Sequence, residues 1–219
     1  MQRLRMRYAK RGRLRFTSHR DFSRAFERAI FRARVPMAYS SGFNPHPRIS
    51  YAGAAPTGAA SEAEYVEIML REVVDPTATM ALLDEALPEG LDLVDVVVSE
   101  GGSLADRLQA SSWRIDIDAP AAQIDGAVRG FLGADEVMVE RMTKRGLRTF
   151  DARAAVVSLE AVDGGVALVL RHQELAVRAD DVIQGLRSYG LEPVTVPLLT
   201  RLSQGPFDEA TGTIGDPLR

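Results

Sequence analysis

Hydrophobic and polar residues alternate at the start of the chain. Within residues 1–8, Leu4, Met6 and Tyr8 alternate with arginines. This period of two predicts a half-buried strand with one face made of arginine. After a turn at 10–12, residues 13–16 alternate again. The two pieces therefore form either a hairpin or one interrupted strand.

Helical spacing replaces this alternation between residues 19 and 34. The apolar positions of the helix are Phe22, Phe26, Ala29 or Ile30, and Ala33. Ser18 is the predicted N-cap, and Pro36 ends the helix because proline lacks a backbone N–H. The opposite side of this helix carries an arginine at every fourth position. Such like-charged neighbours destabilise an isolated helix.

The remaining pattern predicts a strand-helix-strand-strand-helix-strand order that occurs twice. In the first half, the later elements are strands at 49–51 and 64–70, a helix at 76–87 and a strand at 91–98. In the second half, they are a strand at 113–118, a helix at 120–131, strands at 137–142, 149–159 and 166–170, a turn at 163–164, a helix at 180–189 and a strand at 194–202.

These elements predict an α+β fold of two tandem ferredoxin-like (split βαβ) units with antiparallel sheets. The first domain covers 1–99, a linker rich in glycine and serine covers 100–112, and the second domain covers 113–202. Residues 203–219 form a flexible tail in this interpretation.

Charge is segregated along the chain. Residues 1–50 contain thirteen Lys or Arg and two acids, whereas the remaining residues contain fourteen basic and twenty-eight acidic side chains. The overall net charge of −3 hides this asymmetry. Such segregation points to a directional partner, and a polyanion suits the basic segment. The alternatives are a solvated basic face and a binding site for an acidic protein surface or for the chain's own acidic half.

We favour RNA over DNA because aromatic residues lie among these arginines and can stack on unpaired bases. The predicted RNA-binding residues are Arg3, Arg5, Arg7, Arg11, Arg13, Arg15, Arg20, Arg24, Arg28, Arg32, Tyr39, Phe43, Asn44, His46 and Arg48. A secondary basic turn consists of Lys144, Arg145 and Arg148.

Composition limits the kinds of metal, cofactor and membrane-spanning site that this chain can form. The chain has no cysteine, which excludes thiolate zinc sites and cysteine ligation of an iron–sulfur cluster within it. No two of its three histidines have the spacing of a helical metal pair. We therefore expect no metal site and no cofactor. Apolar runs fall short of the roughly 18 residues of a membrane span, and the start lacks a signal peptide, so we expect a cytoplasmic protein without a membrane partner.

Several segments resemble a known family, the radical-SAM-linked domain of unknown function. They are Gly12-Arg-Leu-Arg-Phe-Thr-Ser-His19 with the arginine-rich helix after it, Tyr39-Ser-Ser-Gly-Phe-Asn-Pro-His-Pro-Arg-Ile-Ser50, Glu64-Tyr-Val-Glu67, and Thr143-Lys-Arg-Gly-Leu-Arg-Thr-Phe-Asp151. The likeness spans nearly all of the chain before the tail. Arg20 departs from it, because relatives are expected to carry an apolar residue there.

The resemblance implies a domain that is either fused behind a radical S-adenosylmethionine enzyme or encoded alone, without an established role. This copy resembles the stand-alone form. It implies a radical SAM protein as a partner in trans, which would carry the cluster-binding cysteines. The tandem arrangement is also similar to the fold of CRISPR repeat-processing RNA endonucleases, an analogy of fold alone.

Three functions remain open at this point. The leading hypothesis is an RNA-binding accessory module, without catalytic activity of its own, that acts with a separate RNA-modification (radical SAM) or processing enzyme. The second is a metal-independent endoribonuclease that uses His46 and His19 as acid and base. The third is a protein-interaction adaptor for a radical SAM partner.

Overall fold

The computed structural model describes residues 1–143 and 146–219, and in this part of the chain the fold is α+β with four α-helices. The chain divides into two compact units. The first consists of Met1–Leu108 and Asp216–Arg219, and the second of Gln109–Gly215. No helix among the described residues has an apolar run long enough to cross a bilayer.

Four strands of the first unit pair in the order β4-β1-β3-β2, and every neighbouring pair among them is antiparallel. Its elements are β1 (Gln2–Lys10), the 3₁₀ helix η1 (Gly12–Phe16), α1 (His19–Arg32), β2 (Ile49–Ala52), β3 (Ala60–Leu70), α2 (Pro76–Ala86), β4 (Leu93–Val98) and η2 (Ala105–Arg107).

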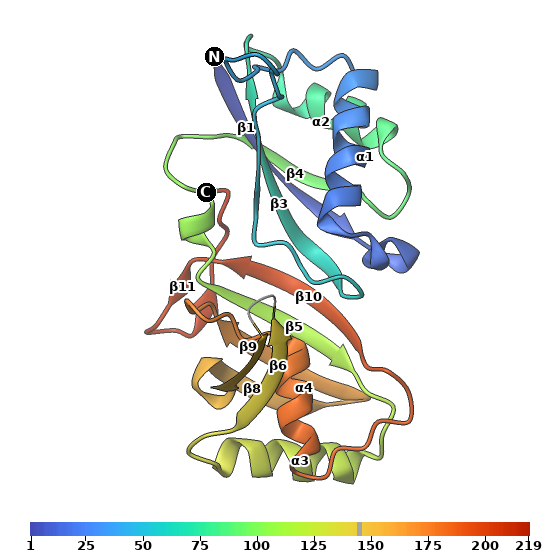
Figure 1. Ribbon diagram of the computed structural model, residues 1–219, viewed down its shortest axis with the longest axis vertical. Helices are drawn as coiled ribbons and strands as arrows, with labels where there is room; N and C mark the ends of the chain where they lie inside the picture. Colours follow the sequence, from blue (N-terminus) through green and yellow to red (C-terminus); the bar gives the residue numbers. More distant parts are fainter. Residues whose placement is uncertain (144–145) are drawn as a thin grey trace. The chain divides into compact units, whose positions relative to one another are not determined.

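Both helices of this unit pack on the same face of its sheet (Figure 1). Leu4 and Met6 of β1 are completely buried there, against Phe26 of α1 and Leu83 of α2. The alternation seen in the sequence therefore points the apolar side chains of β1 at the two helices.

The arginine face of β1 is partly covered. A second apolar cluster joins Ala63 and Tyr65 of β3 to Leu104, Leu108 and Leu218. On the arginine face Arg5 is buried, whereas Arg3 is exposed and Arg7 is half-buried. The prediction of a half-buried strand is therefore wrong at Arg5 but not along all of the arginine face.

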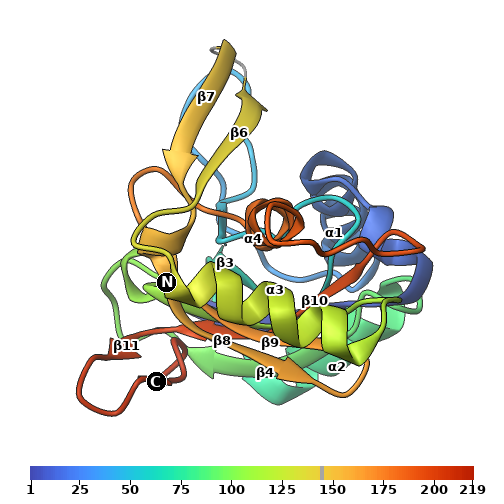
Figure 2. The same cartoon turned by 90° about the horizontal axis from the view of Figure 1, so that it is seen from below.

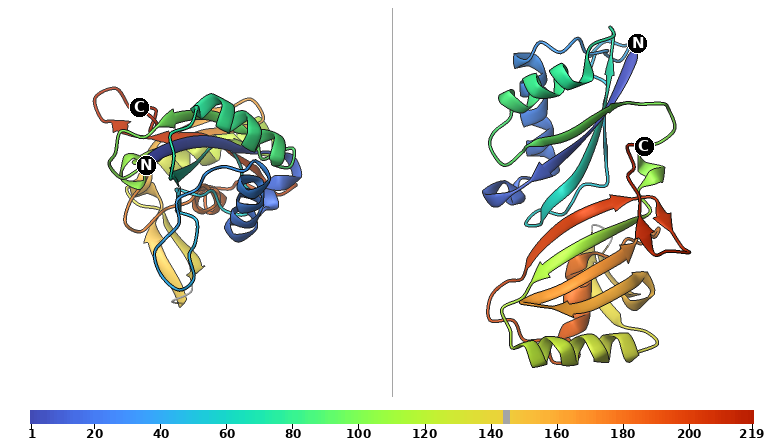
Figure 3. Two further views of the ribbon diagram at one scale, coloured as in Figure 1. Left: turned by 90° about the horizontal axis from the view of Figure 1, so that it is seen from above. Right: turned by 180° about the vertical axis from the view of Figure 1, so that it is seen from behind.

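Four strands of the second unit pair in the order β10-β5-β9-β8, and they too are antiparallel. The rear view of Figure 3 shows β10 in red beside β5 in green, with β9 and β8 in orange. The elements are β5 (Ala110–Asp116), α3 (Ala121–Gly133), β6 (Met138–Thr143), β7 (Gly146–Asp151), η3 (Arg153–Ala155), β8 (Val156–Val162), β9 (Gly165–Arg171), α4 (Ala179–Arg187), β10 (Leu198–Gly205), β11 (Phe207–Asp208) and β12 (Thr213–Ile214).

Strands β6 and β7 form a separate hairpin between α3 and β8 (Figure 2). Val139 and Phe150 are buried at its base, whereas Met142 and Leu147 near its tip are mostly exposed. The Asp163-Gly164 turn joins β8 to β9 as predicted, and Gly164 has the positive φ of 68° that this turn needs.

Three elements differ from the sequence prediction. Residues 13–16 belong to η1 rather than a strand, because Gly12 turns the chain at a φ of 53°. The single strand expected over 149–159 is two strands separated by η3. Asp151 breaks it, since its carboxylate accepts the backbone N–H of Arg153 at 2.8 Å and makes a turn. The last strand starts at Leu198 rather than 194.

The expected linker and tail are also more structured than predicted. Residues 110–112 already belong to β5, and Leu104 and Leu108 are buried. Beyond residue 203 the chain completes β10, forms β11 and β12, and buries Leu218. In these segments a few buried apolar residues stand among Gly, Asp and Thr. The polar composition of the segments therefore led to the wrong prediction of a linker and a flexible tail.

Candidate nucleic-acid interface

Helix α1 carries most of the predicted contacts, and its local sequence explains its position. Ser18 caps it by accepting the backbone N–H of Asp21 at 3.2 Å, as predicted. Phe22, Phe26 and Ile30 are buried, so the predicted apolar stripe is confirmed. Burial of that stripe fixes the rotation of the helix and turns its opposite side to solvent.

Four arginines of α1 form a row on the solvent side, which we call the arginine row: Arg20, Arg24, Arg28 and Arg32. All four side chains are exposed. Among residues 1–143 and 146–219, no carboxylate lies within 4.0 Å of any of these guanidinium groups. Their positive charge is therefore not neutralised by the described part of the chain.

The end of α1 is a Schellman motif without glycine. Val35 donates its backbone N–H to Ile30 at 3.1 Å, and Arg34 donates to Phe31 at 3.2 Å. Arg34 consequently has a φ of 53°, the only positive value at a non-glycine residue of the described chain. An L-residue with a side chain is strained there, whereas glycine is not.

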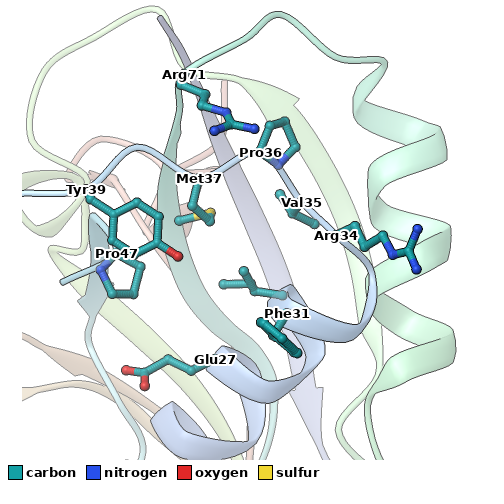
Figure 4. Close-up of a pocket in the computed structure, with 10 residues that line it drawn as sticks. Glu27, Phe31, Arg34, Val35, Pro36, Met37, Tyr39, Pro47 and Arg71 are labelled. Carbon is teal, nitrogen blue, oxygen red and sulfur yellow. The ribbon is translucent and has the colours of Figure 1, made fainter. Parts of the chain in front are cut away.

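A pocket of about 650 Å³ opens beside this helix end. We call it the Phe31 pocket. In Figure 4, Tyr39 and Pro47 stand on one side and Phe31 on the other, with Met37 between them. Its lining residues are Glu27, Ile30, Phe31, Arg34, Val35, Pro36, Met37, Tyr39, Pro47 and Arg71.

The pocket continues onto the arginine row. A second, more open hollow of about 550 Å³ is lined by Arg24, Glu27, Arg28, Phe31 and Arg32. Glu27 and Phe31 belong to both hollows. Phe31 is 84% exposed, which is unusual for so large an apolar side chain. The row and the pocket therefore form one surface of the first unit.

Strand β3 holds the wall that faces α1. The backbone N–H of Ala38 donates to Met69 at 2.8 Å, and that of Arg71 donates to Pro36 at 2.9 Å. Met37 is buried by this pairing. The segment that follows α1 is thus hydrogen-bonded to the end of β3, and the loop supplies Tyr39 and Pro47 to the pocket.

The predicted loop at 39–48 is present and closes on itself. Ser40 donates its backbone N–H to the carbonyl oxygen of His46 at 2.9 Å, and its hydroxyl accepts the backbone N–H of His46 at 3.0 Å. Phe43 and Asn44 at the tip are exposed, and Tyr39 at the base is 56% exposed. Arg48 is exposed beside Met69, whose sulfur lies 3.4 Å from Nη1.

The arginines of β1 do not form the open face that the sequence suggested. Arg5 is 1% exposed; its Nε lies 2.7 Å from Glu67, and its Nη2 donates to the carbonyl oxygens of Gly101 and Gly102. Arg3 lies 3.7 Å from the same carboxylate, and Arg7 is partly buried. The prediction that Arg5 binds RNA is wrong, because its buried guanidinium is bonded to Glu67, Gly101 and Gly102 within the fold.

The arginines around η1 differ in their availability. Arg11 pairs with Glu62 and, at 2.8 Å, with Asp92; the hydrogen bond to Glu62 is the main reason why its pKa is raised. Arg15 lies 4.5 Å from the centre of the Phe16 ring. Arg13 is exposed.

The two histidines of the ribonuclease alternative have different surroundings. The ring of His19 meets Tyr51 edge-on at 4.9 Å, and its Nδ1 lies 3.4 Å from the Ser23 hydroxyl. His46 is exposed on the loop. No hydrogen bond or ring contact joins the two imidazoles in the described structure.

Burial raises the pKa of Tyr51, with a smaller contribution from the Glu27 carboxylate.

Of the secondary basic turn, Lys144 and Arg145 lie outside the described residues. Arg148 is exposed on β7, opposite Arg141 of β6. Arg141 pairs with the buried Asp181, so its charge is neutralised within the fold.

Among the described residues, no group of three metal-binding side chains is found.

Comparison with known proteins gives a family and no function. Residues 3–182 match the family described as an uncharacterized protein conserved in bacteria, DUF2344. The chain belongs to this family. No curated protein matches it. Arg71 and the whole arginine row lie within the part that matches DUF2344.

The sequence did not predict several side chains that line the Phe31 pocket, among them Glu27, Phe31, Arg34 and Arg71. A signal existed for Phe31. At about 100° per residue, position 31 projects between positions 20 and 24, on the side of the arginine row rather than on the apolar stripe. Arg71 gave no such signal, because only tertiary structure brings the end of β3 to α1.

The arginine row offers guanidinium groups without a carboxylate within 4.0 Å among the described residues, whereas Arg71 at the pocket pairs with Glu72 at 3.0 Å. The exposed ring of Phe31 and the carboxylate of Glu27 lie beside the row. Guanidinium groups bind phosphate oxygens, and aromatic rings stack on unpaired bases.

Proposed function

We propose that this chain is an RNA-binding accessory module that acts with a separate RNA-modification enzyme of the radical SAM class or with an RNA-processing enzyme. The observation that carries the proposal is the arginine row, with Phe31 exposed beside it and no carboxylate within 4.0 Å of its guanidinium groups among the described residues. We infer that the first unit binds the RNA and that α1 is its main contact.

The repulsion between the arginines of α1 supports a polyanionic ligand. Arginines four residues apart repel one another, and each such pair costs roughly 0.2–0.5 kcal/mol in an isolated helix. Some other arginines are paired with carboxylates, as Arg5, Arg11 and Arg141 are. A set of charges left without partners is explained if phosphates neutralise it in the complex.

Single-stranded RNA fits this surface better than duplex DNA. Phe31, Tyr39 and Phe43 expose their rings within one unit, and rings can stack only on bases that are free of a duplex. Reading of DNA in the major groove would instead use polar side chains directed at base edges. We therefore propose unpaired RNA as the substrate class.

We also infer that each unit is a ferredoxin-like fold, so that two occur in tandem. Strand orders of β4-β1-β3-β2 and β10-β5-β9-β8, all antiparallel, support this inference. In both units two helices connect the strands, as in a split βαβ motif. The hairpin of β6 and β7 is then an insertion in the second unit. Folds of this class serve many functions, so this inference adds little to the case for RNA.

The proposed partner follows from the family resemblance. The motifs at 12–19 and 39–50 resemble the radical-SAM-linked domain, and this chain contains no cysteine. A cluster held by thiolates would consequently belong to the partner protein. The module would hold the RNA while the partner modifies it.

Fluorescence anisotropy with a labelled single-stranded RNA, measured from about 50 to 300 mM salt, tests the proposal. We expect a log-log slope close to −0.7 for each phosphate contact. Replacement of Arg24 and Arg28 by glutamine should weaken binding and make the slope shallower by about 1.4. Arg129→Gln, an exposed arginine of α3, is the matched control and should leave both unchanged. Absence of binding at low salt would refute the proposal.

A further inference from the structure

The Phe31 pocket contains a polar group that the binding of a phosphate chain does not explain. Glu27 lines both hollows, and a carboxylate repels phosphate. Within the described residues, no arginine or lysine lies within 4.0 Å of the Glu27 carboxylate. Its negative charge is thus available to a ligand at the one place where the arginine row meets a pocket.

The size of the pocket suits a nucleoside rather than an ion. Its volume of about 650 Å³ lies within the range of roughly 300–1,000 Å³ that is typical of small-molecule sites. Tyr39 and Phe31 face it from opposite sides in Figure 4, and both rings remain largely exposed. Two aromatic surfaces on either side of a cavity can receive one flat heterocycle by stacking.

A carboxylate beside such a cavity discriminates between the bases. It can only accept hydrogen bonds, and its two oxygens match two adjacent donors. Guanine presents adjacent donors on its Watson–Crick edge, the N1–H and the exocyclic amino group. Adenine and cytosine place an acceptor next to their amino group, and uracil has a single N–H between two carbonyls. Each of these would repel one carboxylate oxygen.

We propose that the Phe31 pocket binds one unpaired guanine base of the RNA strand, stacked by Phe31 and Tyr39 and recognised through its Watson–Crick edge by Glu27. The inference rests on the proposed function and adds base specificity to it. Phosphates on one side of this nucleotide contact Arg24, Arg28 and Arg32, which line the adjoining hollow. Arg34, at the pocket itself, contacts the phosphate of the bound nucleotide, whereas Arg71 is paired with Glu72 at 3.0 Å.

Octamers of uridine that carry a single central G, A or C test the inference, with the all-uridine octamer as the reference. One matched pair of hydrogen bonds corresponds to about a 5- to 150-fold preference, so the octamer with G should bind at least about fivefold more tightly than the others. Inosine at the same place lacks the amino group and should lose most of that preference. Glu27→Gln should abolish the preference for G over the other bases.

Matched variants separate recognition from folding. Glu85→Gln, an exposed glutamate of α2 away from the pocket, should keep the full preference for G. Phe31→Ala removes a side chain that is 84% exposed, so the fold should persist while binding of the octamer with G falls about tenfold. A circular dichroism melt that is unchanged for both variants shows that they are folded.

The outcomes distinguish the two proposals. Equal binding of all octamers by a protein that still responds to Arg24→Gln would overturn the guanine inference and leave RNA binding intact. Absence of binding to every octamer would overturn the proposed function itself. Guanosine 5′-monophosphate tests the source of the base: it should compete only weakly. If it binds as tightly as the octamer with G, and Arg24→Gln has no effect, the ligand is a free nucleotide rather than an RNA strand.

Discussion

Arg34 donates its backbone N–H to the carbonyl oxygen of Phe31 at 3.2 Å, and the same turn gives Arg34 a φ of 53°. The residue that ends α1 thus combines a strained backbone with a guanidinium at the Phe31 pocket. Backbone strain of this kind is often retained at functional sites. Glycine would end the helix without strain, so the arginine is explained by its side chain.

Replacement of Arg34 by glycine should therefore separate stability from binding. Relief of the left-handed strain, less the extra backbone entropy of glycine, should stabilise the protein by about 0.5–1 kcal/mol. Urea denaturation measures this gain. RNA affinity should fall, because one phosphate contact is lost. Arg34→Lys keeps both the strain and a charge, and should change stability little. A glycine variant that is less stable than the wild type would contradict this account of the helix end.

The arginine row makes a similar prediction in the helix interior. Arg28 has an arginine four residues before it and another four residues after it, and each like-charged pair costs roughly 0.2–0.5 kcal/mol. Arg28→Gln should thus raise the free energy of unfolding by about 0.4–1 kcal/mol at low salt. Screening should reduce the gain at 1 M salt.

Arg129→Gln is the control of opposite sign, because Asp125 lies four residues before Arg129 in α3. This variant should lose about 0.2–0.5 kcal/mol. Thermal melts at two salt concentrations measure both effects. If Arg28→Gln and Arg129→Gln change stability in the same direction, repulsion within the row is not significant.

The Arg5–Glu67 pair should matter to folding rather than to RNA. Arg5 is 1% exposed, and Arg5→Leu leaves the carboxylate of Glu67 without its main partner. Loss of one partner of a buried pair destabilises proteins by about 3–5 kcal/mol. Arg11→Gln, at a side chain 48% exposed, should cost no more than about 1 kcal/mol.

Chemical denaturation of the two variants gives this comparison, and a double variant tests its cause. Addition of Glu67→Leu to Arg5→Leu should recover part of the lost stability, since no unpaired charge remains. No recovery would indicate that packing, rather than the charge, dominates at this position.

The sequence predicted the helices better than the exposure of the arginines. Ser18, Phe22, Phe26 and Pro36 determine α1 through local capping and periodicity, and both can be read from neighbouring residues. The burial of Arg5 cannot be read in this way, because the segment that covers it lies almost a hundred positions later. A period of two shows that a strand has two faces, without showing whether both are covered.

The same limit applies to the candidate site. Its first part, the arginine row, follows from spacing of four along one helix. The pocket joins Glu27 and Phe31 to Tyr39, Pro47 and Arg71, and only pairing of the 36–38 segment with β3 brings them together. The sequence predicts a role for Tyr39 from its place among arginines. It does not show which residues surround Tyr39 in the folded pocket.

Tyr51 provides a test of the electrostatics beside the arginine row. Burial, aided by Glu27, raises its pKa above the ordinary value of 10.0. The folded protein then holds this proton more strongly than the unfolded chain does. The resulting stability is fully present below about pH 10 and is lost as the pH rises further, through the pKa of the folded state.

Urea midpoints at pH 8 and pH 11 measure this loss. The wild type should lose more stability over this interval than Tyr51→Phe, which has no phenol to ionise at this position. Because the other tyrosines and the lysines titrate equally in both proteins, the difference isolates Tyr51. Equal losses would mean that the environment of Tyr51 does not favour its neutral form.

Photo-crosslinking tests the central claim, that the α1 surface of the first unit binds RNA, most directly. A single-stranded RNA with 4-thiouridine is irradiated on the full-length protein, and mass spectrometry identifies the crosslinked peptides. We predict crosslinks in residues 19–48, with Phe31 and Tyr39 prominent, and their loss at high salt. Crosslinks confined to residues 109–215, or none under conditions in which the RNA is bound, would contradict the account.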